Sequence, residues 1–500
     1  MNKKILIIVA LVATCVATNA QSYYGQSWLM GAGGIYAKFT GTTYQIDTTI
    51  NLVLNSGKFF SFNKSNLCDS NGNIHLVTDG YNIMTKDGFY IEGGDTLCDE
   101  YHYLFEGGYS HFAQTGLFLP MQNGKCYFVN NFASQYMIDS IWSGSYFNIN
   151  YPYPLDEMNY STIDLYANNG DGKVTKRLQP LLTNALLSRS QMMACRHGDG
   201  KDWWLFKMAV DSNNIHSFLV TQDSIYNKGI QRMPFARTPW SRDGFDYLGQ
   251  MTFNSDGTKM ATTKLDYTDN VYIADFDRCY GNFSNYKKIT APHMYTQAYN
   301  YIDSATTGLC FSPNGQFLYV AKENFVLQYD LTDQTWFTIC ANDTDATNFM
   351  RYAILNLAPD GKIYIGNWLG NGKQMSVINN PNGKGANCNF CRKCFRVNSY
   401  FSLLTTPPCM PNYGLDAMPN CWPLSSEQLA ISSEQLEVYP NPSSTIFEVR
   451  GSKKGSKKEL YNSIGQLIIS TKENEIDVHN LSKGMYYLKV GNQTKKVVVE

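Results

Sequence analysis

The chain has 500 residues, with 41 Lys and Arg against 42 Asp and Glu and a formal net charge of −1. This length exceeds what one ordinary core serves, so we expect one large domain and a small appendage. The basic residues are dispersed, which argues against nucleic acid as a partner. The 35 Tyr residues suit half-buried strands, and aromatic rings also line carbohydrate-binding surfaces; we favour the structural explanation.

Residues 1–20 predict a secretory signal peptide. Lys3 and Lys4 precede an apolar run from Ile5 to about Val16, and Thr18-Asn19-Ala20 is a small-residue cleavage site before Gln21. No later stretch approaches the ~20 apolar residues that a transmembrane helix needs. We therefore expect an exported protein without a transmembrane segment.

Thirteen cysteines are present, and Cys15 leaves with the signal peptide. An even number remains, which in an exported protein predicts disulfides. Cys68 and Cys98 flank one hairpin, so they are candidates for a bridge between neighbouring strands. The connectivity cannot be deduced from the sequence.

The stretch from Phe311 to Asp330, FSPNGQFLYVAKENFVLQYD, predicts two strands around an Asn314-Gly315 turn and then a third strand. Similar units recur at Met251–Thr263 and Leu357–Asn367. A primed hairpin turn requires positive φ, which Gly adopts without the steric cost of a Cβ. We therefore expect primed turns at these Asn-Gly and Asp-Gly pairs.

Six such units are countable, which is typical of the four-stranded blades of a β-propeller. The other three span Phe59–Tyr90, Leu117–Tyr166 and Gln191–Ile225, and Met375–Asn379 is the expected outer strand of the sixth. Trp28–Asp47 predicts an opening strand of the kind that completes the last blade. We expect a seventh blade shared between this strand and the Cys-rich stretch up to Trp422.

The chain changes character after the duplicated SSEQL segments, which predict a linker at 425–435. Short strands are expected at Phe447–Val449, Leu467–Ser470, Met485–Val490 and Lys496–Val499, and they predict a compact β-sandwich. The expected fold class is thus all-β: a propeller at 21–424, with seven blades, followed by a small sandwich at 436–500.

The C-terminal region resembles the sorting domain of the Bacteroidetes type IX secretion system. The resemblance rests on YPNP at Tyr439–Pro442, LYNSIGQLI at Leu460–Ile468, NLSKGMYYLKV at Asn480–Val490 and the terminal KKVVVE. It implies that residues 436–500 engage the type IX machinery. It also implies secretion or attachment at the outer-membrane surface, commonly with removal of the domain.

Residues Phe59–Phe390 are similar to secreted Bacteroidetes propellers that lack an assigned activity. The motifs are SNGNIHLVTDGYNIM, KDWWLFKM, FNSDGTKMATT, FSPNGQFLYVA, LAPDGKIYIGN and MSVINNPNGKGANCNF. This resemblance implies a fold and an export route, and it transfers no catalytic residue.

The sharpest candidate for metal or redox chemistry is CNFCRKC, with Cys388, Cys391 and Cys394, followed by single Cys409 and Cys421. Thiolates at this spacing can hold zinc or an iron–sulfur cluster. A second paired CxxC or His pair is missing, so we favour disulfides. An exchanging Cys391–Cys394 pair remains a third interpretation, although no thioredoxin-like pattern surrounds it.

Asp69, Asn71 and Asn73 imitate the start of a calcium loop, but Gly80 stands where the loop requires Glu. An Asx-stabilised hairpin turn is the favoured explanation. Asp343 and Asp345 are two further carboxylates that we interpret as a solvated turn rather than a calcium site. No metal or cofactor is therefore expected.

His197 precedes Gly198-Asp199-Gly200 and the pair Trp203-Trp204. We favour a polar hairpin His beside structural aromatic residues over a catalytic one. The chain lacks the HExxH, GxSxG, P-loop and GxGxxG motifs. Five tripeptides resemble a Bacteroidetes O-glycosylation pattern: Asp47-Thr48-Thr49, Asp95-Thr96-Leu97, Asp139-Ser140-Ile141, Asp223-Ser224-Ile225 and Asp303-Ser304-Ala305.

These observations favour an exported binding or adhesion module at the cell surface, with a glycan or surface polymer as ligand. The alternative is a glycan-active hydrolase or lyase with acidic or His residues at the channel mouth, and a structural surface-layer component is a third class. The sequence identifies no catalytic or ligand-binding residue.

Overall fold

The computed structural model describes residues 20–31, 35–47, 55–57, 60, 63–142, 154–210, 213–235, 249–264, 269–296, 301–303, 306–341, 350–367, 373–396, 406–419, 421, 437–450, 455–462, 465–490 and 493–500. The chain divides into two compact units. Unit 1 comprises Met1–Ile225 and Ile230–Pro423, and unit 2 comprises Tyr226–Gly229 and Leu424–Glu500. The predicted linker and the predicted signal peptide, apart from Ala20, lie outside the described residues. Within these residues, no helix is long and apolar enough to cross a membrane.

Unit 1 is all-β, and its described strands form seven antiparallel sheets of three or four strands, numbered here in chain order. Sheets 1 to 4 consist of β1 (Ser27–Met30), β2 (Ile35–Thr40) and β3 (Thr43–Asp47); β4 (Ser65–Cys68), β5 (Ile74–Thr78) and β6 (Ile83–Thr85); β7 (Gly116–Pro120), β8 (Lys125–Phe132), β9 (Glu157–Asp164) and β10 (Lys173–Leu182); and β11 (Leu187–Arg196), β12 (Trp203–Ala209), β13 (Asn214–Val220) and β14 (Ile225–Arg232).

Sheets 5 to 7 consist of β15 (Gly249–Phe253), β16 (Lys259–Lys264), β17 (Asn270–Asp277) and β18 (Asn282–Thr290); β21 (Thr306–Phe311), β22 (Phe317–Lys322), β23 (Phe325–Asp330) and β24 (Thr335–Ala341); and β25 (Tyr352–Leu357), β26 (Ile363–Asn367), β27 (Gln374–Ile378) and β28 (Phe390–Arg396). A two-stranded ribbon joins β19 (Met294–Thr296) and β20 (Tyr301–Asp303). The helices are short: η1 (Ala20–Gly25), α2 (Glu100–Phe105), α3 (Gln135–Trp142), η2 (Asn168–Gly170) and η3 (Gly385–Cys388).

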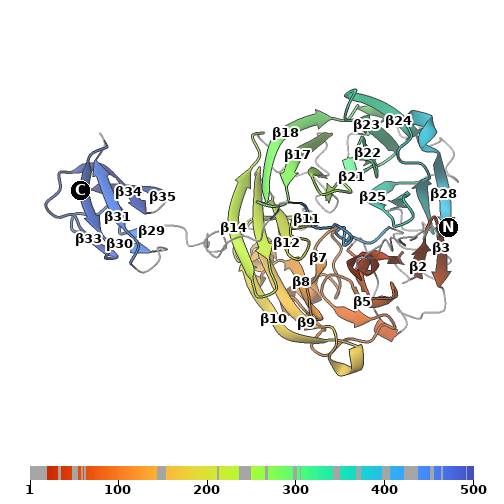
Figure 1. Cartoon of the computed structure of the whole chain (residues 1–500), viewed down its shortest axis with the longest axis horizontal. Helices are drawn as coiled ribbons and strands as arrows, with labels where there is room; N and C mark the ends of the chain where they lie inside the picture. Colours follow the sequence, from red (N-terminus) through yellow and green to blue (C-terminus); the bar gives the residue numbers. More distant parts are fainter. Residues whose placement is uncertain are drawn as a thin grey trace, which may run out of the picture. The chain divides into compact units, whose positions relative to one another are not determined.

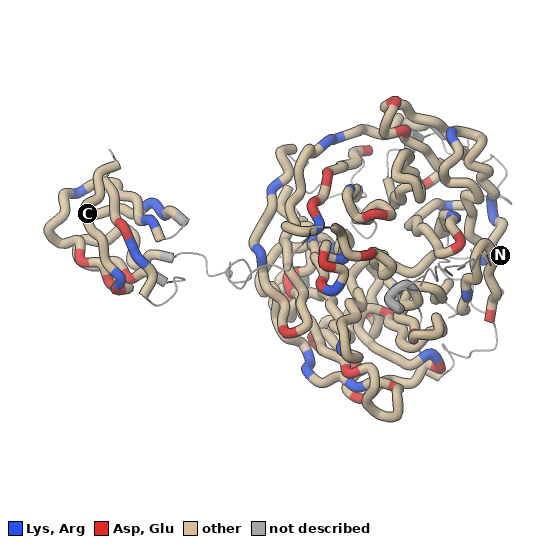
Figure 2. The backbone as a smooth tube through the Cα atoms, viewed as in Figure 1, with Lys and Arg blue, Asp and Glu red and all other residues tan. Residues whose placement is uncertain are grey.

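The sheets follow one another around a ring (Figure 1). The first strand of each sheet contacts the first strand of the next, in the order β1, β4, β7, β11, β15, β21 and β25. These strands are almost wholly buried, whereas most positions of outer strands such as β10 and β18 are exposed or half-buried. Charged residues of both signs are interspersed around the ring (Figure 2).

An aromatic cluster joins the first sheet to the last. The ring of Tyr364 in β26 lies 5.9 Å from Trp28 and 5.8 Å from Phe39, and Tyr44 lies 5.0 Å from Phe395 in β28. The prediction that Trp28–Asp47 completes the last sheet is therefore wrong in detail. This segment forms sheet 1, and sheet 7 has four strands of its own. The outer strand of sheet 7 is β28, from the Cys-rich stretch, and not Met375–Asn379.

The turns at Asn314-Gly315, Asp256-Gly257 and Asp360-Gly361 are hairpins, but these three are not the primed turns that we expected. Gly315, Gly257 and Gly361 have φ of 69°, 73° and 77°, whereas the Asn or Asp before each is not among the residues of positive φ. The Gly315 amide donates to the Ser312 carbonyl at 2.9 Å. This is a type I turn followed by a left-handed Gly, so the requirement for Gly is right and the turn class is different.

Buried side-chain amides tie neighbouring sheets together. Asn66 bonds the backbone of Leu29 and Ser27 in sheet 1, and Asn63 accepts from Thr115 and Gly116 at sheet 3. Gln250 of β15 accepts from the Leu309 and Leu355 amides and donates to the Leu355 carbonyl. Carboxamides thus supply the hydrogen bonds that strands of different sheets cannot exchange directly.

Residues 406–419 and 421, here called the axial segment, cross the inside of the ring (Figure 1). The segment begins beside Lys64, which precedes β4; the Lys64 Nζ donates to Thr406 Oγ1 at 2.6 Å. It ends at the hairpins of sheets 4 and 5, where Cys421 forms a disulfide with Cys279. The Cys-rich stretch therefore contributes β28 to sheet 7, as expected, but its later part, the axial segment, crosses the ring instead of adding a strand.

Unit 2 contains two antiparallel sheets around one core. The first has the order β29 (Glu437–Tyr439), β30 (Ile446–Arg450) and β33 (Glu475–Asp477). The second has the order β32 (Leu467–Thr471), β31 (Lys458–Asn462), β34 (Gly484–Val490) and β35 (Gln493–Val499). Phe447 and Leu488, from opposite sheets, are both fully buried in the shared core. The four predicted strands are present within one to three residues of their expected ends.

Candidate functional site

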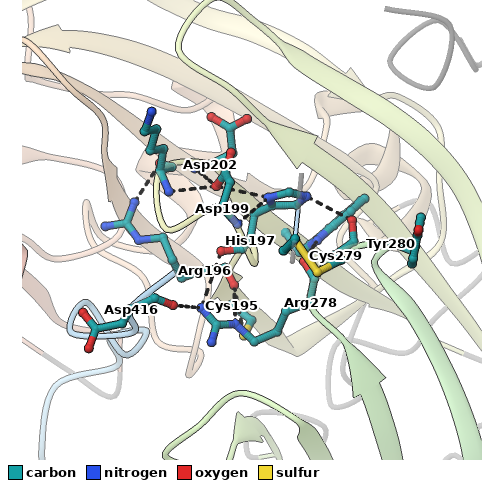
Figure 3. A network of polar contacts seen from close by, with 12 residues as sticks. Cys195, Arg196, His197, Asp199, Asp202, Arg278, Cys279, Tyr280 and Asp416 are labelled. Atoms are coloured by element: carbon teal, nitrogen blue, oxygen red, sulfur yellow. Dashed lines mark hydrogen bonds and ion pairs between the residues drawn. A yellow bond between two sulfur atoms is a disulfide. The ribbon is translucent and has the colours of Figure 1, made fainter. Parts of the chain in front are cut away.

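His197 lies in the hairpin between β11 and β12 and is only 1% exposed. Its Nε2 lies 3.0 Å from the Cys279 carbonyl, and its Nδ1 accepts from the Asp199 amide at 3.0 Å (Figure 3). Both ring nitrogens are therefore engaged by the protein. This geometry supports a structural hairpin His, because a general base needs a nitrogen that can reach substrate.

Arg278 is the centre of the same network (Figure 3). Its guanidinium donates to the carbonyl oxygens of Arg196, Asp256 and Asp416 at 2.9, 3.2 and 2.7 Å. These carbonyls belong to sheet 4, sheet 5 and the axial segment. One buried cation thus links three chain segments that are far apart in the sequence.

Two carboxylates in this hairpin have opposite pKa shifts. Burial and the neighbouring Asp199 raise the pKa of Asp202 to about 6. Burial also raises the pKa of Asp199, but the adjacent His197 ring and the hydrogen bonds from the Lys201 and Asp202 amides outweigh it and lower that pKa to about 2. The Asp199 carboxylate therefore stabilises the turn, and its charge also contributes to the raised pKa of Asp202.

A groove of about 1,010 Å³ lies between sheets 1 and 2. Its lining combines aromatic, amide, carboxylate and ammonium side chains: Tyr36, Lys38, Gln45, Asp47, Asn55, Asp69, Asn73, Lys86, Asp87 and Phe89. Phe89 is 61% exposed. An exposed aromatic ring among planar hydrogen-bonding groups offers both an apolar face and directional polar contacts to a ligand.

The polar side chains of the groove are held by one another. Lys38 Nζ donates to Asn73 Oδ1 at 2.6 Å, and Lys86 Nζ lies 2.9 Å from both Asp87 oxygens. Asp69 Oδ1 accepts from the Asn71 and Asn73 amides at 2.8 and 2.9 Å. The calcium-like sequence is therefore an Asx-stabilised turn, as favoured above, and that turn forms part of the groove wall.

Fewer cysteines form disulfides than the even count predicts. Cys279–Cys421 and Cys391–Cys394 are bonded, whereas the other eight described cysteines form no disulfide: Cys68, Cys98, Cys126, Cys195, Cys310, Cys340, Cys388 and Cys409. Cys68 and Cys98 do not pair; both are buried apolar residues of the core. Free cysteine behaves as a small hydrophobe, which explains why an even count overestimates bridges. The Cys391–Cys394 bond favours a disulfide over a metal site in CNFCRKC.

Sequence reasoning missed Glu106, which follows α2 and whose side chain is 7% exposed. Burial raises its pKa to about 7, although Arg189 lowers it. The His111 Nε2 lies 3.1 Å from the Glu106 carbonyl oxygen and 3.8 Å from its Oε2. A carboxylic acid that titrates near neutrality can exchange protons, but no motif in the sequence marks such a residue.

Other predicted sites fall partly outside the described residues: Asp343, Asp345, Thr48, Thr49, Ser304 and Ala305. In the three remaining glycosylation tripeptides, Asp95, Asp139 and Asp223 are exposed, and the hydroxyl residues beside them are half-buried. Glycosylation of these residues remains a prediction that an intact-mass measurement would check.

Residues 437–500 match the family of secretion system C-terminal sorting domains. No curated protein matches the chain. Solved structures similar to it include an extracellular domain from B. thetaiotaomicron, at 10% identity and TM-score 0.37, covering 95% of this chain and 57% of that one. Apo AztD from Citrobacter koseri has 12% identity and TM-score 0.33, with 66% and 73% covered. The Pseudomonas aeruginosa periplasmic gluconolactonase PpgL has 12% identity and TM-score 0.30, with 66% and 97% covered.

Structural likeness at these TM-scores supports no argument about activity. The sorting domain, by contrast, is matched over nearly all of unit 2, including β29 to β35. Such a domain directs its cargo through the type IX machinery. The protein is therefore exported by this route to the cell surface or the extracellular space.

Proposed function

We propose that unit 1 is a seven-bladed β-propeller that acts as a binding or adhesion module outside the cell, with a glycan or surface polymer as its ligand. In this proposal the propeller spans 21–424, the linker 425–435 and the sorting domain 436–500. The sorting domain serves delivery, and binding takes place on the propeller.

The propeller assignment is supported by seven sheets in a ring whose first strands contact one another in order. The aromatic cluster of Trp28, Phe39, Tyr44, Tyr364 and Phe395 is the proposed closure between first and last blades. Closure by side-chain packing would leave no apolar edge of the ring exposed to water.

The groove between sheets 1 and 2 carries the functional proposal. A sugar ring has an apolar C–H face and a rim of hydroxyls, so it requires an aromatic surface beside hydrogen-bonding side chains. Phe89 supplies that surface, Gln45 supplies a donor and an acceptor, and Asn55, whose Nδ2 donates to the Asp87 carbonyl, supplies an acceptor through Oδ1. The groove has room for several sugar rings, at about 1,010 Å³.

The test is a glycan and polysaccharide binding screen on the purified protein, with mass spectrometry of the same solutions. We expect Phe89→Ala to weaken binding of the retained glycan by roughly 5- to 30-fold, since an aromatic contact contributes about 1–2 kcal/mol. Tyr280→Ala is the matched control, because Tyr280 is equally exposed at 60% and is not among the groove residues.

Three outcomes are informative. Retention that Phe89→Ala weakens and Tyr280→Ala leaves unchanged supports the groove. Equal binding by the wild type and Phe89→Ala refutes the groove as the binding surface. New saccharide fragments in the wild-type solution refute a pure binding module and support the hydrolase or lyase alternative, for which Glu106→Gln is then the first variant to assay.

A further inference from the structure

A second cavity, of about 280 Å³, lies between the ring and the axial segment. Strand ends from sheets 4 to 7 form most of its wall, Trp28 of sheet 1 contributes, and Met410–Leu415 cover it. We call it the axial cavity. It is distinct from the groove, because the two share no lining residue.

The axial cavity has no charged side chain among the described residues that line it. Its two thiols are neutral as well, because burial raises the pKa of Cys195 and of Cys310 to about 12. A charged ligand would lose its hydration here without gaining a counter-ion. The lining therefore selects for an uncharged ligand.

The amide groups at the cavity are largely committed to the protein. Asn412 Nδ2 donates to the Ser255 carbonyl and Asn412 Oδ1 accepts from the Gly414 amide, at 3.1 and 3.0 Å. Asn356 Nδ2 donates to the Pro408 carbonyl at 2.9 Å, and Asn254 Oδ1 accepts from the Lys259 amide at 2.9 Å. A sugar would find few partners for its hydroxyls, so the chemistry favours an apolar ligand.

Aliphatic side chains form part of the apolar wall, and its rings and methionine sulfur atoms come from Trp28, Phe253, Phe311, Tyr413, Met193 and Met410. Methionine sulfur makes favourable contacts with aromatic rings, and rings also pack edge to face with one another. A cavity of about 150 Å³ with an apolar lining already accommodates benzene. The axial cavity, at about 280 Å³, has space for a larger compound with more than one ring.

We propose that the axial cavity is a binding site for a small, neutral aromatic molecule. The axial segment controls access to it. Tyr413 Oη donates to the Phe118 carbonyl at 3.0 Å, and the Met418 amide donates to the Gly198 carbonyl at 2.7 Å. The Cys279–Cys421 disulfide attaches the end of the axial segment covalently to sheet 5. This site is independent of the proposed glycan groove.

The test uses the full protein and the neutral probe N-phenyl-1-naphthylamine, whose fluorescence rises on transfer from water to an apolar site. We expect saturable binding at one site per chain. Ala358 lines the cavity and is 4% exposed, so Ala358→Leu fills part of it and is expected to weaken binding at least tenfold. The matched control is Ala274→Leu, at a buried alanine of β17 that is not among the lining residues.

Circular dichroism and thermal melting establish whether each variant folds. If Ala358→Leu does not fold, Leu415→Phe replaces it, because a larger side chain at 415 fills the cavity from the axial segment. Absence of saturable probe binding to the wild type overturns the proposal. Unchanged binding by a folded filling variant also overturns it. Phe89→Ala is expected to bind the probe normally, so failure of this site and failure of the groove are distinguishable.

Discussion

At the scale of single residues, burial decides the chemistry of Glu106. Its pKa rises from 4.5 to about 7 because the carboxylate is desolvated beside α2. Between these pH values the folded protein holds a proton that the unfolded chain has released, so the free energy of unfolding falls as pH rises from about 4.5 to 7. Above pH 7 the ionised form remains destabilising.

Glu106→Gln should remove this dependence. We expect the variant to exceed the wild type in free energy of unfolding at pH 8 by up to about 3 kcal/mol, with little difference at pH 4. Urea denaturation at several pH values measures it. A difference that stays constant across pH, or a variant that is less stable at pH 8, would contradict the assignment of a buried, destabilising carboxylate.

At the scale of strands, Gln250 shows how neighbouring sheets are joined. Gln250→Leu would leave the Leu309 and Leu355 amides and the Leu355 carbonyl without this partner in a buried setting. We expect a loss of about 2–4 kcal/mol in free energy of unfolding by urea denaturation. Gln179→Leu on outer strand β10 is the control and should change it by less than about 0.5 kcal/mol. Equal losses in the two variants would show that the hydrogen bonds of Gln250 contribute no more to stability than those of an outer-strand side chain.

The outer and inner strands also differ in how well their sequences predict them. The inner strands of sheets 6 and 7 contain apolar runs and are followed by glycine turns, so their positions follow from local chemistry. Strand β28 lies in CNFCRKCFR, where neither apolar alternation nor a turn signal marks a strand. It forms because it pairs with the open edge of β27, and the sequence of 390–396 alone does not indicate that this edge is available.

At the scale of the whole molecule, the axial segment is held at its far end by Cys279–Cys421, whose partners are 142 residues apart in sequence. Opening so long a loop enlarges the unfolded ensemble, so Cys421→Ser should lower the free energy of unfolding by about 2–5 kcal/mol. The control is Cys394→Ser, because Cys391 and Cys394 are only three residues apart. Urea denaturation should show a much smaller change for the control; equal changes would contradict the loop-entropy account.

The sequence by itself determined the repeated strand–turn–strand units, the glycines of positive φ, the sorting domain and the export route, because each depends on neighbouring residues or on a contiguous motif. Only the tertiary structure decided which cysteines pair, that the Cys-rich stretch crosses the ring, and which side chains form the groove and the axial cavity. Residues such as Phe89, Trp28 and Tyr413 acquire their roles from residues that are far away in the chain. Contacts of this kind cannot be predicted from the local sequence.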